Sequence, residues 1–163
     1  MSAQSSPASP LFLREAEIRR GVELLFFGYG HLLSIIDERL AAEGIGRAHH
    51  RALYFIARQP DCTVSALLGL LGITKQSLGR VLNELTAREW VEMRPGRDDR
   101  RQRLLRVTAA GGRLEAELFE LLRARLSAAY VEAGPAAVAG FWQVLEGLVP
   151  PADRPMLARL RGG

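Results

Sequence analysis

Residues 63 to 108 contain two short helical patterns followed by a hairpin pattern, and this succession constrains the fold more than any other feature. Thr63 is a good N-cap, and Gly72 stands where a glycine commonly ends a helix. After the turn at Gly72, Thr74 is a second N-cap candidate. Apolar residues recur at helical spacing as Ala66, Leu67, Leu70 and Leu71, and then as Leu78, Val81, Leu82 and Leu85. The sequence predicts two helices joined by a tight turn, each with one face in a core.

A β-hairpin is predicted directly after the second helix. Residues 91 to 94 alternate apolar and charged side chains, and residues 105 to 107 do so again on the return. Residues 94 to 106, which include the loop 95 to 103, carry six arginines and two aspartates, a local charge of +4. An isolated run of charge is more often a solvated loop. After two helices of this kind, it indicates a wing that contacts the backbone or minor groove of a polyanion.

The outward side of the second helix carries hydrogen-bond donors and amides. Such groups pair with base edges in the major groove, whereas hydroxyls, Lys and Arg bind phosphate. Of the 22 basic residues only Lys75 is a lysine, and guanidinium groups suit bidentate contacts to phosphate and guanine. We predict contacts to double-stranded DNA by Thr74, Lys75, Gln76, Ser77, Arg80 and Asn83 on the helix and by Arg94, Arg97, Arg100 and Arg101 on the wing.

These residues resemble a known family. The runs ITKQSLGRVLNEL and RPGRDDRRQRLL and the wing motif Asp99-x-Arg101 are similar to the MarR family of bacterial transcriptional regulators, and within it to the subgroup called PetP-like. The resemblance is strong over residues 63 to 108 and rests on pattern alone in the flanking helices. It implies that Asp99 braces the wing and that Arg101 reaches into the minor groove. Gly96 and Arg97 occupy the places of the family's usual Asp-Pro.

The segments on either side of this unit are predicted to form a helical dimerisation layer. One stripe of a long first helix consists of Ile18, Val22, Leu25, Tyr29, Leu32, Ile36 and Leu40. The stripe is wider than one small winged domain can cover, so part of it should meet another chain. Leu25 and, after the wing, Leu118 are predicted interface residues. The alternative is that the terminal helices pack only on the winged unit of their own chain.

The predicted fold class is mainly α with a small β-hairpin wing, a winged helix-turn-helix plus a helical dimerisation layer. The predicted segments are a disordered N-terminal arm at 1–10, a dimerisation helix at 11–46, the winged helix-turn-helix DNA-binding region at 47–108, C-terminal dimerisation helices at 109–149 and a short tail at 150–163. A dimer would hold two reading helices about 34 Å apart, which predicts a pseudo-palindromic DNA site.

Three possibilities for regulation remain open, two of them with a regulatory input. The resemblance implies a pocket for aromatic or anionic small molecules where the dimerisation helices meet the winged unit. Candidate lining residues, any of which could equally be packing or surface, are Tyr29, His31, Arg39, His49, Arg51 and Tyr54. The second input is oxidation of Cys62, whose thiol pKa a helix N-terminus would lower. A lone cysteine is, however, usually a small buried hydrophobe. The third possibility is a protein without an effector.

No catalytic constellation, metal-ligand spacing or phosphate-binding glycine loop is visible, so an enzyme is the poorest class and no cofactor is predicted. No apolar run approaches the ~20 residues of a membrane span, and the N-terminus lacks signal-peptide features, so we expect a cytoplasmic protein. The predicted function is a sequence-specific DNA-binding transcriptional regulator, expected to be a repressor, that acts as a homodimer. The alternative is a winged-helix module that binds protein or RNA.

Overall fold

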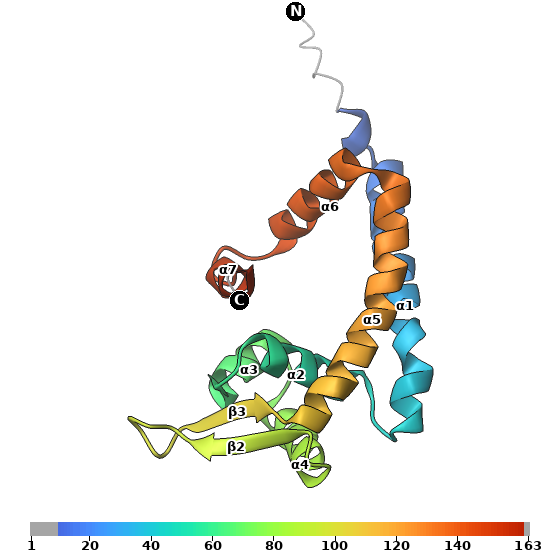
Figure 1. Cartoon of the computed structure of the whole chain (residues 1–163). Coiled ribbons are helices and arrows are strands. Elements are labelled where there is room, and N and C mark those ends of the chain that lie inside the picture. The colour runs from blue at the N-terminus through green and yellow to red at the C-terminus, as the bar shows by residue number, and fades with distance from the viewer. Residues whose placement is uncertain (1–9, 162–163) are drawn as a thin grey trace, which may run out of the picture.

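Two long helices lie side by side and form the spine of the protein, at the right of Figure 1. They are α1 (Glu15–Ala42) and α5 (Ala109–Ala133). This computed structural model describes residues 10–161, so the arm predicted at 1–10 lies outside the described residues except for Pro10. The backbone at Pro10 and Arg14 is extended, which confines 11–13 to the short 3-10 turn η1 (Leu11–Leu13) and delays the predicted start of the helix. No helix within 10–161 is long and apolar enough to cross a membrane.

The predicted helix-turn-helix is present at one end of this spine. It consists of α3 (Val64–Leu71) and α4 (Lys75–Ala87), and the preceding helix α2 (Arg47–Arg58) packs against both. The hydroxyl oxygen of Thr63 accepts a hydrogen bond from the backbone N–H of Ala66 at 3.1 Å, and Thr74 accepts one from Ser77 at 3.1 Å. Gly72 ends α3 in the left-handed region, at φ 60°. Both predicted N-caps and the predicted glycine terminus are therefore confirmed.

The predicted hairpin is formed by β2 (Val91–Pro95) and β3 (Arg103–Val107), which pair in antiparallel register. It projects from the helices, at the lower left of Figure 1. A third strand, β1 (Cys62–Thr63), pairs with the other edge of β3, so that the sheet order is β1-β3-β2. The sequence did not predict β1 because a strand of two residues is too short to show alternation.

The core lies where α2, α3, α4 and the lower part of α5 meet the sheet. Fully buried members include Leu53, Ile56, Leu67, Leu78, Leu85, Leu105 and Leu118. The predicted apolar face of α4 is buried throughout. Ala66 is an exception to the predictions for α3, because it is exposed. It lies about 100° around the helix from Leu67, whose side chain points into the core.

The far halves of the terminal helices expose large apolar side chains. The helix α6 (Pro135–Leu148) leans away from the spine and leads to α7 (Arg154–Arg161) (Figure 1). Exposed hydrophobic residues of the first helix and of α6 include Ile18, Val22, Leu25, Phe26, Phe27, Phe141, Trp142 and Val144. Leu118 differs from this group, since it is fully buried within its own chain. Its predicted place in an interface between chains is therefore wrong.

Candidate functional site

The outward face of α4 presents side chains with no partner elsewhere in the described chain. Lys75, Gln76, Arg80 and Asn83 are exposed and form no hydrogen bond or ion pair with any residue of 10–161. The core-facing side of the same helix is buried, so these four groups project from a fixed platform. The helix thus offers two cations and two amides to an external partner.

Thr74 and Ser77 have a different position from these four residues. The Thr74 hydroxyl caps α4 and donates to the Ser77 Oγ at 2.9 Å. Ser77 Oγ keeps its own proton for a further contact. Both residues are exposed at the N-terminus of α4, where the helix dipole favours an anion. They are therefore placed to meet a phosphate beside the four outward side chains.

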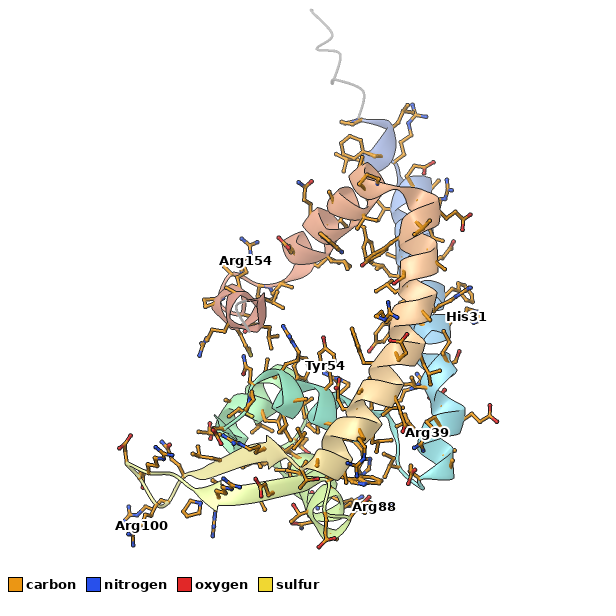
Figure 2. All side chains as sticks on the ribbon, in the orientation of Figure 1. His31, Arg39, Tyr54, Arg88, Arg100 and Arg154 are labelled. Atoms are coloured by element: carbon orange, nitrogen blue, oxygen red, sulfur yellow. The ribbon has the colours of Figure 1, made fainter. Side chains whose placement is uncertain are left out.

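The wing carries four exposed arginines that form no ion pair with a carboxylate of residues 10–161, although, after the hydrogen bond from Arg106, the charge of one of them, Arg97, also lowers the pKa of the Asp61 carboxyl. They are Arg97, Arg100, Arg101 and Arg103, and Figure 2 shows Arg100 at the tip of the hairpin. Arg94 is instead paired with Glu92 at 2.6 Å, in an exposed ion pair. Exposed pairs of this kind contribute about 0–1 kcal/mol. A phosphate could therefore replace Glu92 at little cost.

A network of hydrogen bonds shapes the wing tip. The carboxylate of Asp99 accepts a hydrogen bond from the backbone N–H of Arg101 at 2.9 Å, which leaves the Arg101 guanidinium unoccupied. Gly96 donates its N–H to the carbonyl of Gln102 at 2.9 Å. A Cβ on Gly96 would lie 2.6 Å from the backbone oxygen of Asp99, so this close approach requires glycine. The tip is therefore closed by backbone contacts at the place where the family pattern has Asp-Pro.

Asp61 holds the base of the wing through Arg106, a role that was not predicted from the sequence. Its carboxylate receives two hydrogen bonds from the guanidinium of Arg106 on β3, and this contact lowers the pKa of Asp61. Asp61 also adopts a φ of 64°, an uncommon value for a residue with a side chain. The only local signal was the turn sequence around Pro60, because the partner lies 45 residues away.

A cavity of about 430 Å³ lies among α1, α2 and α5. Its walls are mainly apolar and include Leu32, Leu33, Phe55, Phe119, Leu122 and Leu126. Of the six residues predicted for such a pocket, Tyr29, Arg51 and Tyr54 line it. The other three, His31, Arg39 and His49, do not.

Ion pairs and helix geometry explain these three exceptions. Arg39 donates to Glu43 at 2.6 Å and to Glu117 at 2.9 Å, which holds its guanidinium outside the cavity. His49 contacts Glu84 at 2.8 Å and accepts a hydrogen bond from the backbone N–H of Gly46. The remaining residue, His31, is exposed on the outer side of the spine, away from Tyr54 (Figure 2).

His50 also lines the cavity and was not predicted to do so from the sequence. It is 5% exposed, and neither ring nitrogen has a hydrogen-bond partner within the described chain. Burial, and then the charge of Arg51, lowers the pKa of His50, so the ring is neutral at neutral pH. Leaving a buried ring nitrogen unpaired costs free energy, which a hydrogen bond to a water or a ligand in the cavity would recover. The signal was present in the sequence, since His50 and Tyr54 are four apart and share a helix face.

The environment of Cys62 contradicts the predicted effect of the helix N-terminus. The thiol is half-buried against the core, and burial raises its pKa to about 11. At neutral pH it is therefore protonated and a poor nucleophile. Desolvation is the largest cause of this rise in pKa, because Cys62 belongs to strand β1 and its side chain packs against the core, and the charge of Asp61 adds to it. Of the two alternatives left open for Cys62, the structure therefore favours the small buried hydrophobe over the reactive thiolate.

Comparison with known proteins places this arrangement in a family. The profile of the MarR family matches residues 43–102. The HTH-type transcriptional regulator PetP of Rhodobacter capsulatus is 50% identical over 144 residues, covering 88% of this chain and 87% of PetP.

Two solved structures share the fold of this chain. A mutant MarR from E. coli, complexed with operator DNA, has a TM-score of 0.66 at 23% identity, covering 87% of this chain and 100% of that one. FabT of Streptococcus pneumoniae, in complex with DNA, has a TM-score of 0.68 at 20% identity, and the match covers 81% of this chain and 99% of the FabT chain. With the identity to PetP and the family profile, these likenesses lead to one conclusion: the chain belongs to the MarR family of transcriptional regulators.

Proposed function

We propose that this transcriptional regulator reads double-stranded DNA with α4 in the major groove and the wing in the adjacent minor groove. The observation that carries the proposal is a set of exposed side chains on α4 and the wing that form no hydrogen bond or ion pair within residues 10–161, namely Lys75, Gln76, Arg80, Asn83, Arg100, Arg101 and Arg103. MarR of E. coli and FabT, which share the fold, were each solved with DNA. A binding protein rather than an enzyme is the class proposed, acting in the cytoplasm, where bacterial DNA is found.

The proposal includes a homodimer. The exposed apolar residues of α1 and α6 lie beyond the winged unit, and burying them in a second copy would be favourable by about 25 cal/mol per Å². A two-fold dimer presents two α4 helices to successive major grooves, on the order of 34 Å apart. The DNA site would then be pseudo-palindromic. The proposed segments remain the winged unit at 47–108 between dimerisation helices at 11–46 and 109–149.

The cavity among α1, α2 and α5 is the proposed effector site. It combines apolar walls with the guanidinium of Arg51 and the unpartnered ring of His50. Apolar walls with a few polar groups are typical of small-molecule sites. A flat aromatic carboxylate fits this combination, since its ring would contact Tyr54 and Phe119 and its charge would meet Arg51.

A salt titration tests the function. A duplex selected by the purified protein from a random library would be compared with unselected duplex. DNA binding that depends on several phosphate contacts should lose roughly a thousandfold in affinity between low and moderate salt, and the selected duplex should bind more tightly throughout. Absence of affinity for either duplex would instead favour a module that binds protein.

Arg80→Ala and Arg101→Ala are expected to affect DNA binding differently. Arg80 projects from α4, and its loss should reduce discrimination between selected and unselected duplex by about 1–3 kcal/mol. Arg101 lies in the wing, and its loss should weaken both duplexes more evenly. Fluorescence anisotropy with both duplexes measures the two effects. Equal losses on both duplexes in both variants would contradict this division between helix and wing.

A further inference from the structure

The corner between α1 and α2, which we define as residues 43–46, has a well-defined backbone. Gly44 is left-handed, at φ 67°, and its N–H donates to the carbonyl of Ala41 at 2.9 Å. The N–H of Ile45 donates to the carbonyl of Leu40 at 3.1 Å, which completes the Schellman motif that ends many helices. The Ile45 side chain is buried in the core of the winged unit. The corner therefore joins the proposed dimerisation helix α1 to the winged unit in one conformation.

Two side chains of α4 hold this corner. Arg88 donates from Nη1 to the backbone carbonyl of Glu43, the C-cap of α1, at 2.6 Å. The Nδ1 atom of His49 accepts a hydrogen bond from the N–H of Gly46 at 3.2 Å, so Nε2 carries the ring proton. Nε2 in turn donates to the carboxylate of Glu84 at 2.8 Å. Glu84 and Arg88 thus connect α4 to both ends of the corner.

These two residues follow the DNA-facing residues along one side of α4. Gln76, Arg80, Glu84 and Arg88 are each four residues apart, so they lie in one row along the helix. The first two are exposed and have no partner among residues 10–161, whereas the last two hold the corner. Lys75 lies about 20 Å along the helix from Arg88, so a tilt of about 10° at the corner moves Lys75 by about 3 Å. Such a displacement equals the rise of about one base pair.

We propose that Glu84 and Arg88 are positioning residues, which fix α4 relative to α1 and thereby set the half-site spacing that the protein accepts. This inference rests on the proposed function, a dimer that reads DNA with two copies of α4. One extra base pair between the half-sites moves one of them by about 3.4 Å and rotates it by about 35°. Two rigidly held helices cannot follow that change, and two loosely held helices can. Loosely held helices must also be ordered on binding, which lowers affinity for the correct site.

A simple surface charge at Glu84 would have the opposite effect on affinity. An acidic side chain on a helix that faces a polyanion repels it, so removing the charge alone should tighten binding to every duplex. Loss of the contact with His49 should instead weaken binding to the correctly spaced duplex. The sign of the change therefore separates the two roles of Glu84.

The first experiment measures the preference for half-site spacing. Fluorescence anisotropy compares the selected duplex with the same duplex carrying one additional base pair between its half-sites, for the wild type, Glu84→Met, Arg88→Met and the double variant. The wild type should prefer the selected spacing by about 100-fold, and the double variant by about tenfold or less. The double variant should also bind the selected duplex about tenfold more weakly. An unchanged preference, or tighter binding of the selected duplex, would overturn the proposal.

Two further variants separate positioning from charge. Glu84→Gln removes the charge and keeps an oxygen that accepts from His49, so it should retain the spacing preference of the wild type. Arg113→Met removes a cation from α5, where Arg113 is exposed and forms no hydrogen bond or ion pair among residues 10–161. It should also retain the preference. Loss of the preference in either variant would show that charge, and not the corner, is the cause.

The second experiment needs no DNA. Amide hydrogen exchange at residues 44–49 should be about tenfold faster in the double variant than in the wild type. Slow exchange in α5 shows that the variant is folded, and unchanged exchange at 44–49 would then overturn the proposal. If the wild type binds no duplex, the proposed function fails, whereas the exchange data still decide whether Glu84 and Arg88 hold the corner.

Discussion

Leu25→Asp is expected to convert the proposed homodimer into a monomer and to abolish tight binding of the selected duplex. Leu25 lies on the apolar stripe of α1 and is 40% exposed in the single chain. An unpaired carboxylate buried between two chains is strongly unfavourable. A monomer meets one half-site at a time, so affinity for the full site should fall roughly 100-fold or more. Sedimentation velocity and anisotropy with the selected duplex measure the two effects.

Ser34→Asp is the matched control for this substitution. Ser34 is exposed about 180° around α1 from Leu25 and lies two turns nearer the winged unit than the exposed Phe27, so the same charge there should leave both assembly and DNA binding unchanged. Leu118→Asp is unsuitable as an interface probe, because Leu118 is fully buried within its own chain and the substitution would unfold the protein. A dimer of Leu25→Asp with normal sedimentation would place the interface elsewhere.

The elements that the sequence predicted well are those with local signals. Thr63, Gly72 and Thr74 mark helix ends through contacts within three or four residues, and the structure shows those contacts. The alternation around Val91 and Val107 likewise specified a hairpin that is present in antiparallel register. Such features depend on hydrogen bonds to near neighbours, so the sequence contains nearly all the information needed to place them.

The features that escaped prediction depend on distant partners. Arg39 pairs with Glu117, 78 residues later, and no pattern within α1 shows that its guanidinium is occupied. Arg106 pairs with Asp61 across the sheet. The pKa of the Cys62 thiol also depends on tertiary packing, since burial against the core raises this pKa although a helix N-terminus is nearby. For the candidate cavity, the sequence supplied residues of the right type, and only the packing of α1, α2 and α5 selected among them.

Gly111→Ala is expected to destabilise the protein strongly, because Gly111 is where α5 meets the hairpin. A Cβ at Gly111 would lie 2.0 Å from the backbone oxygen of Trp90 and 2.8 Å from the carbonyl carbon of Trp90. The same Trp90 oxygen accepts the N–H of Thr108, the N-cap of α5. The alanine would therefore separate α5 from the hairpin or break the hydrogen bond at this junction.

Gly112, the next residue in α5, provides a matched control for Gly111→Ala. A Cβ on Gly112 would meet only a methyl group of Val107, at 4.0 Å, so Gly112→Ala should stabilise the helix by about 1 kcal/mol. Overpacking at Gly111 should instead cost on the order of 3 kcal/mol, since the obstructing atoms are backbone and no rotamer change relieves them. Urea unfolding followed by circular dichroism should move the two midpoints in opposite directions. Equal midpoints would mean that α5 can shift away from Trp90, and the wing would then not be rigidly fixed to the dimerisation helices.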